Sequence, residues 1–466
     1  MKLQAILKKN IKYVVLFIVF FLCLQFFYMN FSGDQVYNYG FSYAVSRGEV
    51  PYRDFNMIIP PLGAFVYAVP FMLLGHSLIL FNLVQATFLC VMFYFLFKLF
   101  DKNAWIALIV LFLPIPIPCV TVLFQGYNFL LILLFIILMY LEKNKKSDYL
   151  IGVVLALMML SKQTVGFFMC LPSFVYLFKD YRKFFRRIGG FFIPCFIFLI
   201  YLLLTGSFVS FFDMCLFGMF DFASKNGGLS RYFTDFYFYL FILEIIFLIS
   251  YLFIKRKDKD IRWKTIYTLM FSSVAVPLFD YNHVSYFTFV LALLFIDKIN
   301  IKAKNVGFNA TLFATAISII WFLFIWDFSL PNIISFNNYE WTVMPKKNVK
   351  EITEITEFMR ENENTILLSE NTYLVKIVLD YDIEHYDLLN YGNHGYNGTN
   401  KLINKLDNEK DVYIALNMDA YERHSVRQQF NKEVVEHVIN NYKFIKSIGV
   451  HDIYYKEWYS EKVFKK

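Results

Sequence analysis

The sequence predicts an α-helical protein that crosses a membrane many times and carries a small α/β domain near its C-terminus. Of the 466 residues, 58% are hydrophobic and 21% aromatic, more than the interior of a water-soluble domain needs. Apolar runs of about 20 residues recur, the length an α-helix needs to cross about 30 Å of hydrocarbon. Composition becomes mixed and charged from about residue 335. We therefore divide the chain into a membrane domain, 1–330, and a C-terminal domain, 335–466.

The first apolar run follows a basic start, MKLQAILKKNIK. A signal peptide begins in the same way, but its apolar core is shorter and it ends at a small-residue cleavage site. The residues after this run, FYMNFSGD, offer no such site. We expect the run to be retained as the first membrane span, with the N-terminus in the cytoplasm.

Eleven membrane spans are predicted if the apolar segment 61–75 is left out of the count. That segment would form only about 22 Å of helix, which is short for a full crossing, so we expect it to lie in the outer leaflet. With this choice the basic clusters between spans fall on the cytoplasmic side, as the positive-inside rule requires. The predicted spans are 12–31, 77–98, 104–123, 127–141, 148–161, 165–178, 188–206, 236–254, 265–279, 284–297 and 308–327.

An odd number of spans places the C-terminal domain outside the cytoplasm. This domain alternates helix-like and strand-like segments, which predicts an α/β fold with a partly parallel sheet. It contains neither GxGxxG nor a Walker A sequence, so no nucleotide site is indicated. We interpret the glycine-rich segment 391–398 as a surface turn. The helix-like segments are 349–363, 398–407 and 428–440, and the strand-like segments are 365–370, 411–417, 442–449 and 452–458.

The net charge of +8 does not indicate a nucleic-acid partner, because the basic residues gather in the predicted cytoplasmic loops. The six cysteines lie in or beside apolar runs and form no CxxC pair. This pattern predicts neither a zinc site nor a disulfide framework. We predict no metal and no cofactor.

The first outer loop, 32–76, holds the two candidate catalytic residues, Asp34 and Asp54. Asp34 follows the first span so closely that it should lie at the lipid–water boundary. A carboxylate there could meet both a lipid-tethered and a water-borne substrate. Asp34 could also cap the following helix, a position that Asp favours, and Asp54 could be a turn residue paired with Arg53 or Arg47.

Four cations on the same side of the membrane are candidate ligands of a donor phosphate: Arg47, Arg53, Lys162 and Arg231. Lys162 lies between two short spans, where a cation is costly unless it reaches the interface or meets an anion. Snorkelling toward water is the alternative explanation for Lys162. Further site candidates are Gln163, as a neutral donor, and His283 and Tyr286 at a later outer turn, where a hydrogen-bonded boundary histidine is the alternative.

Acids and cations on one membrane face suit the transfer of a sugar from a polyprenyl phosphate. The acceptor hydroxyl must lose a proton to a positioned carboxylate. The departing phosphate gains charge, which fixed cations stabilise. Arginine suits this role because its fork of donors matches phosphate geometry.

With these features the chain resembles the GT-C glycosyltransferase superfamily, nearest the family of protein O-mannosyltransferases and the lipid A aminoarabinose transferase. The resemblance implies a GT-C fold and an inverting transfer from a polyprenyl-phosphate sugar to an extracytoplasmic hydroxyl acceptor (a glycopolymer, a lipid or a protein). It implies that Asp34 acts as the general base and that the protein lies in a bacterial plasma membrane, in contact with membrane lipid. The matching residues are Asp34, Gly48, Pro51-Tyr52-Arg53-Asp54, Pro60-Pro61-Leu62, Lys162 within Ser-Lys-Gln-Thr, and His283 with Tyr286.

One position departs from the family pattern, because relatives often carry a second acid where this chain has Gln35. Two other functions share the compartment. A polysaccharide polymerase or ligase would favour a large outer loop late among the spans. A transporter of lipid-linked glycans would show paired halves with ionisable residues near the bilayer midplane, whereas here Glu244 is the main such residue. The acids and arginines in the first outer loop favour the transferase.

Overall fold

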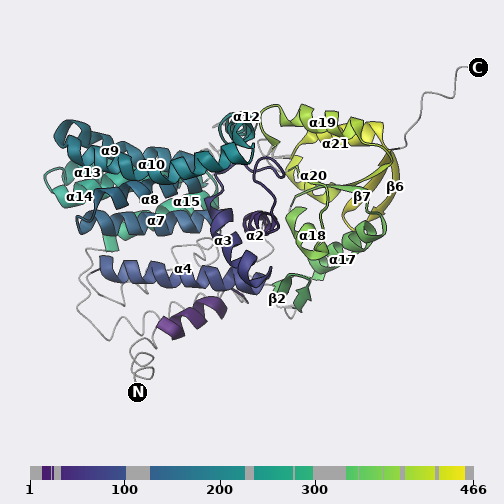
Figure 1. Ribbon diagram of the computed structural model, residues 1–466, viewed down its shortest axis with the longest axis horizontal. Coiled ribbons are helices and arrows are strands. Elements are labelled where there is room, and N and C mark those ends of the chain that lie inside the picture. The colour runs from purple at the N-terminus through teal and green to yellow at the C-terminus, as the bar shows by residue number, and fades with distance from the viewer. Residues whose placement is uncertain are drawn as a thin grey trace, which may run out of the picture.

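The computed structural model describes residues 13–22, 24–25, 33–100, 126–225, 236–276, 279–296, 332–344, 346–370, 372–388, 394–425 and 430–456. The predicted spans 104–123 and 308–327, and the candidate Arg231, lie outside these ranges. Figure 1 shows a bundle of long helices beside an α/β domain, with helices α2 and α3 between them.

Four of the described helices are long and apolar enough to cross a membrane. They are α4 (Leu78–Leu99), α7 (Gly126–Lys143), α10 (Tyr181–Leu204) and α13 (Phe236–Ile254). The other bundle helices are α8 (Asp148–Ser161), α9 (Gln163–Lys179), α14 (Lys259–Phe271) and α15 (Tyr281–Ile296), with a short helix before α2 at Tyr13–Leu22.

The predicted number of eleven spans is not confirmed. Most described helices begin and end within a few residues of a predicted span, but several have less than the length of a full crossing. Helix α8, for example, has 14 residues, which is about 21 Å of helix. The pattern of apolar residues predicted where these helices lie. The short length of several of them means that the pattern did not predict how many helices cross the bilayer.

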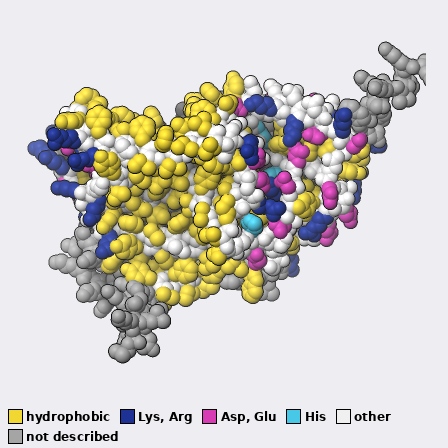
Figure 2. Space-filling view, in the orientation of Figure 1, with side chains coloured by type: hydrophobic (Ala, Val, Ile, Leu, Met, Phe, Trp, Pro, Cys, Tyr) yellow, Lys and Arg dark blue, Asp and Glu magenta, His cyan; other side chains and the backbone are white. Residues whose placement is uncertain are grey.

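Burial distinguishes the centre of the bundle from its rim. In α7, 72% of the apolar window is buried, against 17% in α10 and in α13. The two rim helices expose large apolar side chains, including Ile197 and Leu243. Figure 2 shows hydrophobic side chains covering this part of the molecule. A surface of this kind is suited to contact with lipid rather than with water.

Basic residues gather at one end of the bundle. Helices α7 and α9 end at Lys143 and Lys179, and α10 begins with Arg182 and Lys183 in its first turn. In Figure 2, dark blue Lys and Arg side chains lie at the end of the bundle farthest from the α/β domain. This arrangement supports the prediction that the basic loops share one side of the membrane.

The first outer loop folds into two helices, α2 (Gly33–Ser46) and α3 (Leu62–Leu74). Helix α3 begins directly after Pro60-Pro61, where proline pre-sets the backbone for a helix start, and it leaves Val69, Met72 and Leu73 exposed. A short helix with an apolar exposed side fits the predicted place in the outer leaflet. A separate segment later in the chain forms α11 (Phe208–Phe212), a π-helical turn (Asp213–Phe217) and α12 (Gly218–Lys225).

The C-terminal part contains the expected partly parallel sheet, in the order β4-β3-β5-β7-β6. Strand β3 is parallel to β4 and β5, whereas β7 is antiparallel to β5 and β6. The elements are β1 (Asn332–Phe336), β2 (Tyr339–Met344), α17 (Lys346–Glu361), β3 (Thr365–Ser369), α18 (Thr372–Leu379), β4 (His385–Asp387), α19 (Gly398–Asn408), β5 (Val412–Asn417), α20 (Met418–Ser425), α21 (Lys432–Asn441), β6 (Lys443–Ile448) and β7 (His451–Lys456).

The hairpin β1–β2 and helix α18 were not predicted, and both attach the C-terminal part to the outer loop. The hydroxyl of Tyr39 on α2 donates to the carbonyl of Asn338 in the hairpin turn. Nε2 of the buried Gln25, which precedes the outer loop, donates to the carbonyls of Glu340 and Trp341, each at 2.9 Å. Tyr373 and Ile377 of α18 share one hydrophobic core with α2. The α/β part is therefore joined to the outer loop through a continuous apolar core.

Helix α2 and helix α18 approach so closely that only glycine fits at residue 40. A Cβ atom there would lie 2.3 Å from Cγ of Tyr373, a buried side chain. We predict that Gly40→Ala weakens the packing of α18 on α2 by about 1–3 kcal/mol, the usual cost of overpacking. Faster amide hydrogen exchange in α18 would report the loss. In the matched control Gly189→Ala, the new Cβ meets only the exposed Tyr149 ring at 3.2 Å, and unchanged exchange of α18 in both variants would contradict the prediction.

Candidate functional site

Asp34 lies in the first turn of α2, next to the start of α7. Asn38 joins the two helices: its Nδ2 donates to the carbonyl of Asp34 at 2.6 Å, and its Oδ1 accepts from the backbone N–H of Tyr127 at 3.1 Å. The contact requires glycine at residue 126, because a Cβ there would overlap the Asn38 side chain. The position of Asp34 is therefore set by packing between two helices.

Lys162 connects α8 to α9 and extends into the same region. Its side chain is only 9% exposed, and its Nζ donates a hydrogen bond of 3.0 Å to the carbonyl of Val274. The ammonium lies 6.0 Å from the centre of the Tyr127 ring. An ammonium has three donors, and the protein contact above uses one of them.

A third contribution comes from the start of α15. Oδ1 of Asp280 accepts from the backbone N–H of His283 at 2.9 Å and lies 2.8 Å from Nδ1 of the same histidine. Tyr286 is fully buried and packs edge-on against the His283 ring. Tyr286 thus supports the histidine. Asp280 was not among the predicted site residues, although an acid at a helix start, three residues before a histidine, is a readable capping signal.

These groups act on one another electrostatically. Burial raises the pKa of Asp34, the charges of His283 and Lys162 lower it, the charge of Asp280 raises it, and the net shift is upward. Burial would also raise the pKa of Asp280, but the charge and hydrogen bonds of His283 outweigh this and leave its pKa below the usual value. Burial lowers the pKa of Lys162 to about 8 despite the nearby Asp280 and Asp34. Asp34 is therefore the more basic carboxylate of the two.

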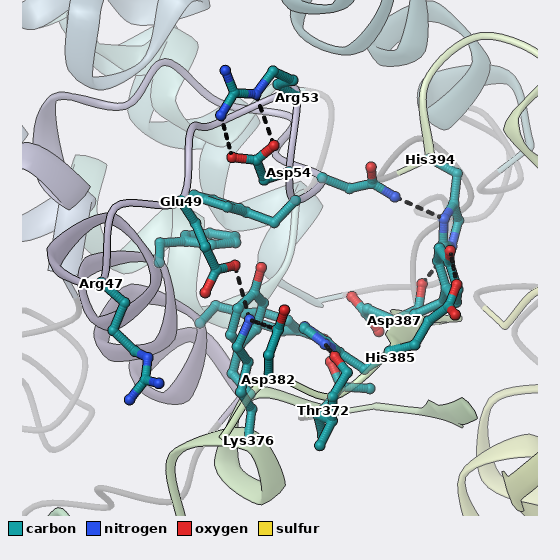
Figure 3. A pocket seen from close by; sticks show the side chains of 18 of the residues that line it. Arg47, Glu49, Arg53, Asp54, Thr372, Lys376, Asp382, His385, Asp387 and His394 are labelled. Atoms are coloured by element: carbon teal, nitrogen blue, oxygen red, sulfur yellow. Dashed lines mark hydrogen bonds and ion pairs between the residues drawn. The ribbon is translucent and has the colours of Figure 1, made fainter. Parts of the chain in front are cut away.

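The other predicted loop residues lie elsewhere. Arg47, Arg53 and Asp54 line a cavity of about 720 Å³ between the outer loop and the C-terminal domain, shown in Figure 3. Arg47 follows the end of α2, thirteen positions after Asp34, which corresponds to roughly 20 Å along the helix. The structure thus brings Lys162 and His283 to Asp34, but it does not bring Arg47 there.

Arg53 and Asp54 form a fork-like pair, with Nε and Nη2 of the arginine each 2.8 Å from a carboxylate oxygen. The Asp54 carboxylate also accepts from the backbone N–H of Val50 at 2.7 Å. The hydrogen bond from Arg53 is the main reason why the pKa of Asp54 is lowered. Asp54 therefore has the geometry of its alternative role, a turn aspartate paired with Arg53. Its lowered pKa makes it a weak base.

Two further residues differ from expectation. Nε2 of Gln163 donates to the carbonyls of Ile58 and Cys215, at 3.0 and 2.9 Å, so this amide ties two outer segments together. His394, in the segment interpreted as a surface turn, is buried. It lies 3.2 Å from the Asn56 amide through Nδ1 and donates from Nε2 to the Asp387 carbonyl at 2.6 Å. That segment is therefore held inside the structure at His394, by the nearby Asp387 and by Asn56, which is far away in sequence.

Within the described ranges, no three His, Cys, Asp or Glu side chains are grouped so that they could hold a metal ion. The absence of a metal and of a cofactor stays a prediction.

Sequence comparison gives no relative: no protein-family model and no curated protein matches the chain. The solved structures similar to it include two of ArnT from Cupriavidus metallidurans. The structure bound to undecaprenyl phosphate has a TM-score of 0.50 at 10% identity and covers 96% of this chain and 98% of that chain. The apo structure has a TM-score of 0.49 at 10% identity and covers 97% and 98%. Over nearly its whole length, this chain therefore has the same overall fold as the ArnT structure bound to undecaprenyl phosphate.

Proposed function

We propose that this protein is an inverting glycosyltransferase that moves a sugar from a polyprenyl-phosphate donor to a hydroxyl group of an extracytoplasmic acceptor. The observation that carries the proposal is the meeting of Asp34, Lys162, Asp280 and His283 from three different segments at one end of the bundle. A desolvated base beside a buried cation is what this chemistry requires. The similar ArnT structure holds undecaprenyl phosphate, which agrees in ligand class.

In the proposed reaction, the acceptor oxygen attacks the anomeric carbon of the donor sugar, and the bond from that carbon to the phosphate oxygen breaks. Asp34 takes the proton of the acceptor hydroxyl. Lys162 faces the phosphate and stabilises the charge that it gains as polyprenyl phosphate leaves. Asp280 accepts from Nδ1–H of His283 and orients the ring, so that in the protonated histidine Nε2–H donates to the phosphate.

The same proposal places the protein in a plasma membrane as a multi-pass protein, with its N-terminus in the cytoplasm and its C-terminal domain outside. The basic loops gathered at one end of the bundle support this orientation. The site then opens at the outer leaflet, where a polyprenyl chain can lie along the apolar helices while its phosphate meets Lys162.

The test is a donor assay with the purified protein and a panel of polyprenyl-phosphate sugars, followed by release of polyprenyl phosphate. We expect one donor to be consumed and Lys162→Gln to raise the KM for that donor about 10- to 100-fold, the effect of losing one charged hydrogen bond. In the wild type the same KM should rise above about pH 8, because Lys162 loses its proton there.

Lys162→Arg keeps its charge at high pH, so its KM should not rise above pH 8 in this way. Two results would contradict the proposal. One is that no donor in the panel is consumed. The other is that Lys162→Gln shows the same KM as the wild type at pH 7.

A further inference from the structure

The cavity between the outer loop and the C-terminal domain is separate from the Asp34 cluster, which consists of Asp34, Lys162, Asp280 and His283. The cavity is built from two distant parts of the chain. One wall comes from α2 and the turn that follows it, and the other comes from α18, β4 and the segments around them. Its volume of about 720 Å³ falls within the range of ligand-binding pockets. It is large enough for a short oligosaccharide.

Each of the four cations that line this cavity already has a carboxylate partner. Lys376, the most buried of them, lies 2.8 Å from Glu49 and 3.2 Å from Asp382. The remaining pairs are Arg47 with Asp380 at 3.1 Å, Arg53 with Asp54 at 2.8 Å, and Lys405 with Glu384. The lining includes five acids, Glu49, Asp54, Asp382, Glu384 and Asp387, against these four cations. An anionic ligand would therefore enter a cavity whose positive charges are already neutralised, with an acid in excess.

The two histidines of the cavity are neutral. His385 donates from Nδ1 to the carbonyl of Ile383 at 2.9 Å, which leaves Nε2 as an acceptor. Burial and the Lys376 charge lower the pKa of His385 to about 4. Burial likewise lowers the pKa of His394 to about 4. At neutral pH these rings offer hydrogen-bonding nitrogens and no charge.

Aromatic rings supply the rest of the lining. Tyr37 and Phe41 lie one turn apart on α2 and stack at 6.0 Å with an angle of 29° between their planes. Both are half-buried, as is Tyr386 on the opposite wall. A sugar ring has an apolar C–H face that packs on aromatic rings and an edge of hydroxyls that pair with carboxylates and neutral nitrogens.

We propose that this cavity binds the acceptor, and that the acceptor is an uncharged glycan chain recognised by paired charges and aromatic rings. The proposal rests on the transferase function above and narrows its acceptor class. The non-reducing end of the chain would extend along α2 toward Asp34, at the other end of the same helix. A phosphorylated or uronic-acid-containing acceptor is disfavoured, because binding it would require an existing ion pair to break.

The experiment measures binding of the full-length protein, in lipid nanodiscs, to neutral tri- to hexasaccharides that differ in sugar and linkage. The panel includes phosphorylated and uronic-acid-containing versions of the same chains. We expect at least one neutral chain to bind and its anionic versions to bind at least tenfold more weakly. Phe41→Ala should weaken the neutral chain about tenfold, whereas the matched control Phe444→Ala, at an exposed position on β6, should bind as the wild type does. Hydrogen exchange confirms that each variant is folded.

A second variant, Asp54→Asn, leaves Arg53 without its carboxylate and should improve binding of the phosphorylated chain. The proposal is overturned if an anionic chain binds more tightly than its neutral version, or if no member of the panel binds. Consumption of a polyprenyl-phosphate sugar is measured on the same preparation. Donor consumption without any neutral-glycan binding would reject this inference alone. Neutral-glycan binding without consumption of any donor would reject the transferase function, and the cavity would then bind a glycan that is not an acceptor.

Discussion

Replacing Asp34 by Asn is expected to lower the rate of sugar transfer at least 100-fold, while donor binding changes little. Asparagine keeps the shape of the side chain and also suits a helix start, so the fold should be retained. It cannot take the proton of the acceptor hydroxyl, and a positioned general base contributes about 10²- to 10⁴-fold to a rate. The measurement is kcat for transfer under saturating donor and acceptor, with the KM for donor determined alongside.

Asp54→Asn is the matched variant, because both residues are candidate bases from the same loop. Asp54 is paired with Arg53 and its pKa is lowered, so we expect its loss to change kcat by no more than a few-fold. The pH profile separates the two further. Because the pKa of Asp34 is raised, transfer should fall on acidification at a pH above the usual aspartate value. A rate abolished by Asp54→Asn and preserved in Asp34→Asn would reverse the assignment.

Asp34, Lys162 and His283 could be chosen as site candidates because their positions relative to the membrane can be read from sequence, whereas Asp280 was missed. Asp34 and Lys162 each lie within a residue or two of the end of an apolar run, and His283 begins another. Runs that end on the same side of a membrane place their ends at the same depth. The common depth places these side chains in one layer, and packing between the helices brings them together within that layer.

Lateral distance within that layer was not predictable from depth. Arg47 and Asp34 belong to the same outer loop, yet the helix between them holds them roughly 20 Å apart. The contact of His394 with Asn56 joins residues 338 positions apart, and no local pattern in one sequence indicates such a pairing. Similarly, the close approach of α18 to Gly40 depends on packing between two separate parts of the chain.

The prediction with the largest expected effect on stability concerns Arg187 of α10, which is 1% exposed. Its guanidinium lies 2.6 Å from Glu142 at the end of α7 and 3.0 Å from Asp148 at the start of α8. It also donates to the hydroxyls of Ser173 and Tyr267, on α9 and α14. One side chain thus joins five helices at the basic end of the bundle.

We predict that Arg187→Ala destabilises the protein by about 3–5 kcal/mol, because it removes the cation nearest to the largely buried carboxylates of Glu142 and Asp148. The measurement is the midpoint of thermal or SDS-induced unfolding, together with the yield of monodisperse protein. Arg186→Ala is the matched control, since Arg186 is exposed on the same turn, and it should unfold as the wild type does. Equal unfolding midpoints for the two variants would contradict the prediction.

The cause of the loss can be separated from the loss of side-chain packing. Arg187→Lys keeps the charge but not the planar fork, so it should recover only part of the stability. If uncompensated charge is the main cost, the combined variant Arg187→Met, Glu142→Gln, Asp148→Asn should be more stable than Arg187→Ala, because no buried carboxylate is left without a partner. If packing dominates instead, the triple variant should be no more stable than Arg187→Met alone. In the native protein, the ion cluster fixes which helices meet at this end of the bundle. The site at the opposite end depends on that arrangement, because α8 and α9 both contact the cluster and Lys162 lies between these two helices.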